Sequence, residues 1–270
     1  MSTFTEQDFW VERTDPRDVT KKIRLYGVLR VPKGAAERKR AYPAVVCAHG
    51  FTANHAEADP YARGLAARGF VSLSLDFFGG GWGIRSDGTL LDMTVETERD
   101  DLLAAMDALT LLPYVDKDNV CLLGCSQGGF VCTMAAAARP ADVRALCLMY
   151  PAFVLHDDAL AAYPQVEDVP ETYPAFDFAP ERSTISRAYN LVARRVDPYA
   201  LMPAYPGQVL IVHGDADAIV PLTYAQRAQT TFLHARLEVL TGADHGLRGD
   251  YLPQAVQLAT EFLAASVVVA

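Results

Sequence analysis

The chain has 270 residues, of which 51% are hydrophobic and 21% charged, a composition ordinary for a globular protein with a sizeable core. Its formal net charge of −9 argues against binding to nucleic acid or anionic membranes, since both repel an acidic surface. The first residues lack the pattern of a secretory signal, and the apolar C-terminal stretch is too short to span a bilayer. Five cysteines without metal-ligand spacing predict reduced core thiols, no metal site and a cytoplasmic location.

Apolar, β-rich segments alternate with helical patterns along most of the chain. The two segments at 9–12 and 23–31 flank a turn and predict an antiparallel hairpin at one sheet edge. Further strands are expected at residues 44–48, 70–75, 120–123, 145–150, 209–212 and 236–240. This alternation is typical of parallel βαβ units, and strands this apolar must be covered on both faces. The sequence therefore predicts an α/β fold with a mostly parallel central sheet and helices on both faces.

Two helix starts can be read from local signals. Asp59 followed by Pro60 predicts an N-cap and first helical position, and Gly69 marks the end of that helix. A second helix is expected at residues 94–112, with Glu96 and Glu98 in its first turn, where the helix dipole favours acidic side chains.

Residues 151–206 break the alternation, because they are rich in proline and aromatic residues and contain no clear strand. A structureless loop of this length is unusual in a compact domain. We therefore expect a helical cap, residues 151–206, inserted into a core formed by residues 1–150 and 207–270.

A Gly-x-Ser-x-Gly sequence at residues 124–128 directly follows one expected strand and precedes a helical pattern. In a nucleophile elbow, this strand–turn–helix holds a serine in a strained, exposed position, and the glycines permit the close packing. Ser126 is therefore the predicted nucleophile, in preference to an incidental serine in a glycine-rich turn. Cys125 is a rival nucleophile, but the position before the serine should point its side chain away from the apex.

A serine hydroxyl needs a base, and the base needs a third group that orients it. Asp215 and Asp217 follow the next-to-last strand, and His245 follows the last. Asp217 lies further into its loop and is predicted to turn toward the histidine, whereas Asp215 is expected to bond backbone amides. Because these loops and Ser126 follow the carboxyl ends of parallel strands, we expect Ser126, Asp217 and His245 to meet at one sheet edge.

Acyl transfer also needs backbone N–H groups for the developing oxyanion, each worth about 3 kcal/mol. The predicted donors are the amides of Gln127, directly after the nucleophile, and of Phe51, in the loop after the strand at 44–48. The remaining histidines show no metal-ligand spacing, so no metal is implied, and this chemistry requires no cofactor.

With these motifs in place, the chain resembles the bacterial cinnamoyl (feruloyl) esterases of the α/β-hydrolase superfamily over residues 20–265. The resemblance is carried by His-Gly-Phe-Thr-Ala-Asn at 49–54, Asp-Met-Thr-Val at 92–95, Gly-Cys-Ser-Gln-Gly-Gly at 124–129 and Gly-Ala-Asp-His at 242–245. It implies an α/β-hydrolase fold with an inserted cap, and it also implies a homodimer.

In that family the cap holds the far end of the aromatic acid, and polar side chains bond the ring hydroxyl. The resemblance implies that Asp158, Gln165 and Tyr189 have this role here. Two interpretations of Tyr189 stay open, namely a substrate contact and a tyrosine packed in the cap core.

The chain departs from the family after the strand that ends at Asp76. The family usually has Gly-His-Gly-x-Ser there, whereas this chain has Gly-Gly-Gly-Trp-Gly at residues 79–83, so a different acyl specificity is expected. Aromatic side chains of the cap are also expected to reshape the pocket: Tyr163, Tyr173, Phe176 and Phe178.

The sequence thus predicts a serine carboxylesterase that hydrolyses esters of hydroxycinnamic acids through an acyl-enzyme. Two alternatives are a generalist short-chain carboxylesterase and a non-catalytic ligand-binding protein of the same fold. An oligopeptidase is disfavoured because no propeller-like segment precedes the domain. The expected partner is a small-molecule ester, with no nucleic acid and no membrane.

Overall fold

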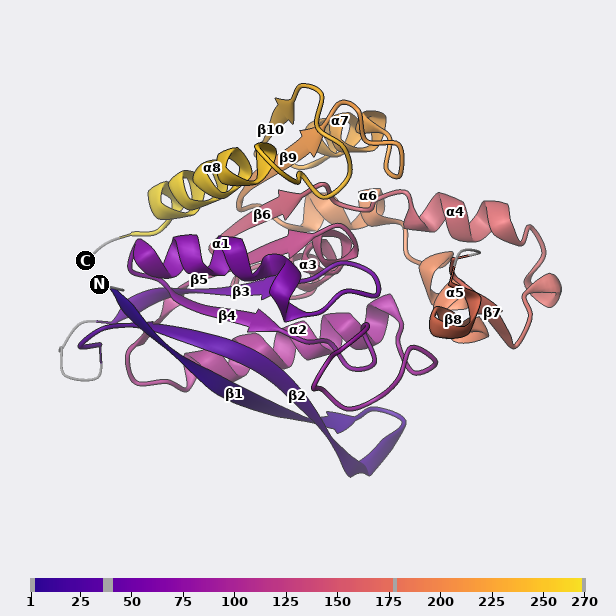
Figure 1. Cartoon of the computed structure of the whole chain (residues 1–270), viewed down its shortest axis with the longest axis horizontal. Helices are drawn as coiled ribbons and strands as arrows, with labels where there is room; N and C mark the ends of the chain where they lie inside the picture. The colour runs from indigo at the N-terminus through magenta and orange to yellow at the C-terminus, as the bar shows by residue number, and fades with distance from the viewer. Residues whose placement is uncertain (1–2, 36–40, 177–178, 269–270) are drawn as a thin grey trace.

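The computed structural model describes residues 3–35, 41–176 and 179–268. Within them a single sheet of eight strands has the order β1-β2-β4-β3-β5-β6-β9-β10 (Figure 1). The strands are β1 (Phe4–Asp15), β2 (Asp18–Pro32), β3 (Tyr42–Ala48), β4 (Val71–Leu75), β5 (Val115–Cys125), β6 (Ala145–Met149), β9 (Gln208–Gly214) and β10 (Ala235–Leu240). The β1–β2 and β2–β4 pairs are antiparallel, and all the other pairs in this sheet are parallel. The expected mostly parallel sheet and its edge hairpin are therefore confirmed.

Helices cover both faces of this sheet, because alternate strand residues are apolar on both sides. In β5, Val120 and Leu122 face one core cluster, and Cys121 and Leu123 face the other. The first face is covered by α2 (Val95–Thr110), α3 (Gln127–Ala138) and α7 (Leu222–Thr231), and the second by α1 (His55–Ala67) and α8 (Tyr251–Ser266) (Figure 1). No helix in the described part of the chain has both the length and the apolarity needed to cross a membrane.

The start of α1 differs from the prediction. The helix begins at His55 with Asn54 as its N-cap, whose side chain accepts a hydrogen bond from Ala56, and Pro60 lies inside it. The reason is a tertiary contact, because Asp76, at the end of β4, accepts hydrogen bonds from both the backbone and the ring of His55. A local Asp-Pro signal cannot report that contact.

Residues 151–206 form a set of short elements, most of which gather at the end of the molecule toward which the parallel strands point (Figure 1). They are α4 (Leu155–Ala162), η1 (Val166–Asp168), β7 (Thr172–Pro174), η2 (Pro180–Arg182), β8 (Thr184–Ser186), α5 (Arg187–Ala193), α6 (Pro198–Leu201) and η3 (Met202–Ala204). Strands β7 and β8 pair antiparallel, so this segment is not wholly helical, as the expected helical cap would be. The last part, including Tyr199 and Met202, packs into the main core beside α3.

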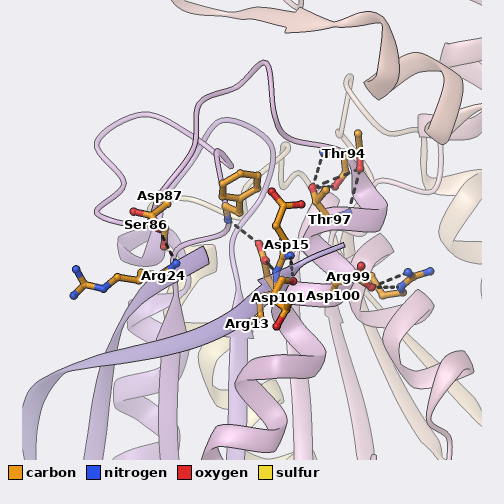
Figure 2. A network of polar contacts seen from close by, with 12 residues as sticks. Arg13, Asp15, Arg24, Ser86, Asp87, Thr94, Thr97, Arg99, Asp100 and Asp101 are labelled. Atoms are coloured by element: carbon orange, nitrogen blue, oxygen red, sulfur yellow. Dashed lines mark hydrogen bonds and ion pairs between the residues drawn. The ribbon is translucent and has the colours of Figure 1, made fainter. Parts of the chain in front are cut away.

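A polar network ties the N-terminal hairpin to α2 and to the loop after β4 (Figure 2). Arg13 of β1 forms a buried ion pair with Asp101 of α2, and the other oxygen of Asp101 accepts the backbone N–H of Phe78 at 2.7 Å. Farther along the hairpin, the backbone N–H of Arg24 donates to Asp87 at 2.8 Å. The loop that follows β4 is thus held at both ends, which positions its central glycine-rich segment beside the site described next.

Candidate active site

Ser126 occupies the tight turn between β5 and α3, with φ of +50° and ψ of −117°. A non-glycine residue in this region is strained, and such strain persists only where the surrounding structure imposes it. Here the backbones of β3, β5 and α3 approach closely around Ser126, and the flanking glycines permit that approach. A Cβ at Gly128 would lie 2.5 Å from the carbonyl oxygens of Ala48 and His49, and one at Gly124 would lie 2.3 Å from the carbonyl oxygen of Gly128.

The three predicted catalytic residues meet at the carboxyl edge of the sheet. His245 Nε2 lies 3.0 Å from Ser126 Oγ, and His245 Nδ1 lies 2.8 Å from Asp217 Oδ2. A carboxylate only accepts hydrogen bonds, so Nδ1 carries the proton and Nε2 is left to accept from the serine hydroxyl. The Tyr150 ring packs edge-on against the imidazole, with ring centroids 5.0 Å apart.

Asp217 is held by more than its histidine. Its Oδ1 accepts the backbone N–H groups of Ile219 at 2.9 Å and Val220 at 2.8 Å, and its Oδ2 also lies 3.2 Å from His213 Nε2. Burial alone would raise the pKa of Asp217, but the hydrogen bonds from His213, His245 and Val220 outweigh it and lower the pKa well below its usual range. Asp217 is therefore an ionised acceptor in a fixed orientation.

Asp215, the other carboxylate of this loop, does not contact His245 and has a structural role. Asp215 accepts the backbone N–H of Gly242 at 2.6 Å and so ties its own loop to the one that carries His245. His213, near the end of β9, bonds the backbone carbonyl of Val220 at 2.9 Å, and its contact with Asp217 was not predicted from the sequence.

Phe51 and Gln127 both lie at the cavity wall beside the nucleophile. The approach is close, because a Cβ at Gly50 would be 3.0 Å from the Cβ of Ser126. Thr52 then adopts φ of +58°, so the loop turns sharply directly after Phe51. The backbones of Phe51 and Gln127, which are predicted to supply the oxyanion donors, therefore both lie next to Ser126, although Phe51 follows β3 and Gln127 follows β5.

Glu98 also belongs to this site, a role that the sequence did not predict. It is fully buried, its Oε2 accepts from the Gln127 side-chain Nε2 at 2.7 Å, and Tyr189 Oη donates to Gln127 Oε1. Burial raises the pKa of Glu98 well above its usual value. The sequence placed Glu98 in the first helical turn, where a solvated acid is ordinary, and only the motif at residues 92–95 just before it hinted at another role.

A cavity of about 550 Å³ opens onto Ser126 and His245, between the core and residues 151–206. Its lining combines aliphatic side chains with five aromatic ones, those of Phe51, Trp82, Tyr173, Phe176 and Tyr189. Of the three residues assigned to the substrate by resemblance, Asp158 and Tyr189 line the cavity. Gln165 does not: it is exposed before η1, away from the cavity wall. Tyr163 packs on Tyr173 instead, with ring centroids 5.4 Å apart, and Phe178 lies outside the described residues.

The glycine-rich loop at residues 79–83 forms part of the cavity mouth. Trp82 lines the cavity, and its indole N–H donates to the carbonyl of Arg182 at 2.6 Å, which joins the loop to the segment above it. Gly81 lies so close to the loop after β3 that a Cβ there would be 1.7 Å from the carbonyl oxygen of Ala53. Trp82 thus forms part of this wall, and Gly80 and Gly83 flank it without side chains.

The strand–elbow–helix serine, with an acid and a histidine after later strands, defines an α/β hydrolase. Solved structures of that fold match nearly the whole chain. Est1E from Butyrivibrio proteoclasticus with ferulic acid bound has a TM-score of 0.82 and 24% identity, over 96% of this chain and 98% of that one. The alpha/beta hydrolase domain-containing protein 10 from mouse has a TM-score of 0.72 and 19% identity, over 96% and 97%. The predicted α/β-hydrolase fold is confirmed.

The chain belongs to the prolyl oligopeptidase family, whose model matches residues 58–268. It is also similar to the serine hydrolase BPHL of Mus musculus, with 26% identity over 182 residues, which is 62% of this chain and 60% of that protein. The chain thus aligns with about three-fifths of the length of that curated relative. Together these matches identify a serine-hydrolase-type α/β hydrolase.

Proposed function

We propose that this protein is a serine carboxylesterase that hydrolyses esters of aromatic, hydroxycinnamate-like acids. The observation that carries the proposal is the contact series from Ser126 through His245 to Asp217, with distances of 3.0 and 2.8 Å, beside a cavity lined in part by five aromatic side chains. A nucleophile, a base and an oriented acid in hydrogen-bond contact are the arrangement that acyl transfer requires.

In the proposed mechanism, His245 Nε2 takes the proton of the Ser126 hydroxyl as Oγ attacks the ester carbonyl. The oxyanion forms between the backbone amides of Phe51 and Gln127, while Asp217 holds the imidazole and stabilises its cation. His245 then gives the proton to the departing alkoxide, leaving an acyl-enzyme. Water, deprotonated by the same histidine, hydrolyses this ester and returns Ser126 to its starting state.

The cavity walls support an aromatic acyl group. The rings of Phe51 and Phe176 lie 5.5 Å apart, and those of Trp82 and Phe176 6.4 Å apart, so a planar acid would meet ring faces and edges. Asp158 of α4 also lines the cavity, and partial desolvation together with Asp157 raises the pKa of its carboxyl. A carboxyl group there would accept a hydrogen bond from a ring hydroxyl. The ferulic acid bound by Est1E, a protein of the same fold, agrees with this assignment.

Two other activities have specific support. A generalist esterase for short acyl groups would use the same three residues, and it is favoured by Gly80 and Gly83, which stand where the resembling esterases have histidine and serine. Membership of the prolyl oligopeptidase family favours cleavage of a peptide bond after proline. The generalist esterase and the peptidase would both form an acyl-enzyme at Ser126. Only the preferred substrate therefore distinguishes them from the proposed aromatic esterase.

The test is steady-state hydrolysis of methyl ferulate, p-nitrophenyl acetate, p-nitrophenyl butyrate and a blocked glycyl-proline p-nitroanilide. The purified chain should give its highest kcat/KM on methyl ferulate, and Ser126→Ala should be inactive on every ester. Activity confined to the short activated esters would make the protein a generalist, and a preference for the anilide would make it a peptidase.

A fluorophosphonate probe separates the enzyme from a non-catalytic ligand-binding protein of the same fold. Wild type should be labelled and Ser126→Ala should not. An unlabelled wild type would mean that Ser126 is not an activated nucleophile, and the proposal would fall.

A further inference from the structure

One residue of α5 contacts both residues whose amides are proposed to bind the oxyanion. The Tyr189 ring packs against the Phe51 ring with centroids 5.3 Å apart, and its hydroxyl donates to the side-chain oxygen of Gln127. Tyr189 is only 7% exposed, although it lines the cavity. Phe51 follows β3 and Gln127 follows β5, so a single side chain from residues 151–206 bridges the two loops beside Ser126.

Gln127 is held from its other side by the core. Its Nε2 donates to Glu98 of α2 at 2.7 Å, and both side chains are fully buried. The side-chain amide of Gln127 is therefore bonded at both ends: its oxygen accepts from Tyr189, and its nitrogen donates to Glu98. A side chain with both ends bonded in a buried setting has little rotational freedom, which restrains the adjoining backbone N–H.

The Tyr189 hydroxyl is committed to this contact. It has a single proton, which it gives to Gln127 Oε1, so it has none left to donate to a substrate oxygen. Burial also raises the pKa of Tyr189 well above its usual value, so the hydroxyl keeps that proton. Tyr189 therefore cannot donate to the acid, and its oxygen is left only to accept from a ring hydroxyl. The packed interpretation of Tyr189 rests on its contacts with Phe51 and Gln127.

We propose that Tyr189 and Glu98 are positioning residues that clamp Gln127 from opposite sides and thereby align the oxyanion hole with Ser126. The clamp joins residues 151–206 to the elbow, so the geometry of the oxyanion hole depends on how α5 is seated. This inference rests on the proposed function, and it makes the chemical step, rather than aromatic recognition, sensitive to the Tyr189 hydroxyl.

The two roles of Tyr189 predict different kinetics. An interaction that acts on the transition state of every ester lowers kcat for all substrates, whereas loss of a contact to the acyl ring affects the aromatic ester alone. Removing the hydroxyl in Tyr189→Phe keeps the ring against Phe51. We expect kcat to fall about tenfold on both p-nitrophenyl acetate and methyl ferulate, short of the roughly 10²-fold or greater loss that follows removal of an oxyanion donor.

Glu98 gives an independent test within the same clamp. Glu98→Gln keeps an oxygen that accepts from Gln127 and should retain wild-type kcat. Glu98→Leu leaves the Gln127 side-chain nitrogen only the weak sulfur acceptor of Met93, 3.7 Å away, and should lower kcat as Tyr189→Phe does. Because the two residues act through Gln127, the losses in the Tyr189→Phe/Glu98→Leu double variant should be less than additive.

Matched controls come from the same elements. Tyr163→Phe removes a hydroxyl from another tyrosine of residues 151–206 that does not line the cavity. Asp107→Asn alters another acid of α2, one that is exposed and pairs with Arg139. Both should leave kcat unchanged on both esters. Circular dichroism and Tm establish that each variant is folded, and if Tyr189→Phe does not fold, the Glu98 pair decides the outcome.

The inference is overturned if Tyr189→Phe raises KM for methyl ferulate while kcat on p-nitrophenyl acetate is unchanged, since that is the behaviour of a substrate contact. It is also overturned if Glu98→Gln is as impaired as Glu98→Leu, or if the double variant shows fully additive losses. In each case wild type remains an active esterase and the proposed function stands. A wild type that cleaves neither ester would refute the proposed function, and this inference with it.

Discussion

Replacing Asp217 by asparagine tests the central assignment of the site with a change of one atom. The asparagine oxygen can still accept the backbone N–H groups of Ile219 and Val220, so the loop should keep its conformation. The amide nitrogen would then replace the oxygen that lies 2.8 Å from His245 Nδ1. Two N–H donors cannot face each other at that distance, so the imidazole would shift its proton to Nε2 and lose the lone pair that accepts the Ser126 proton.

We expect kcat to fall by roughly 10⁴-fold, because a histidine in the wrong tautomer cannot act as the base. That loss equals about 5 kcal/mol of transition-state stabilisation. The stability cost should be smaller, about 1 to 3 kcal/mol for charge-assisted hydrogen bonds that become neutral ones. Activity should therefore collapse in a protein that remains folded at 25 °C.

The pH dependence of stability provides a second readout. The pKa of Asp217 is lowered in the folded state, so its contribution to stability is complete above its unfolded-state pKa near 3.8 and is lost as the pH falls below that. Wild type should lose stability more steeply than Asp217→Asn on acidification below about pH 4.

The assay is p-nitrophenyl acetate hydrolysis, followed together with urea unfolding at pH 7 and pH 3.5. Asp215→Asn is the matched control, because Asp215 lies in the same loop but bonds the Gly242 backbone instead of the histidine. It should keep kcat and lose only stability. Equal kcat losses in the two variants, or more than a tenth of wild-type kcat in Asp217→Asn, would refute the assignment of Asp217.

Three further outcomes are expected. Gly128→Ala should abolish folding or activity, because its Cβ would lie 2.5 Å from the carbonyl oxygens of Ala48 and His49. Near-ultraviolet circular dichroism and ester hydrolysis measure the two effects, and a fully active variant would contradict the elbow geometry. Cys125→Ala should keep both activity and fluorophosphonate labelling, since the thiol is fully buried and burial raises its pKa, and loss of labelling would point to Cys125 as the nucleophile. Burial raises the pKa of Asp101 to about 6, with Arg13 opposing the rise, so the free energy of unfolding should fall by about 2 kcal/mol as the pH rises from about 4 to 6. Urea titrations across that range should show a shallower decline in Asp101→Asn, and identical slopes would contradict the shift.

Local pattern was enough for much of the fold. Continuous apolar runs identified the parallel strands, and the Thr-Asp-Pro-Arg-Asp turn identified the edge hairpin, because these signals depend on chain-local propensity and on burial of both sheet faces. The same reasoning failed at His55, where the helix start depends on Asp76, and at β7 and β8, whose three-residue strands are too short to carry a periodic pattern.

The sequence by itself determined the elbow around Ser126 and the predicted order of nucleophile, acid and base. The reason is that Gly-x-Ser-x-Gly between a strand and a helix is typical of one kind of turn, and parallel strands bring their carboxyl ends to one edge. Tertiary structure alone decided which side chains surround Ser126, Asp217 and His245. It excluded Gln165 from the cavity wall, turned Tyr189 toward Gln127 and buried Glu98 beneath it. Glu98 and Tyr189 are far apart in sequence and meet only at Gln127. Their meeting depends on how residues 151–206 pack against the core, which no local sequence pattern encodes.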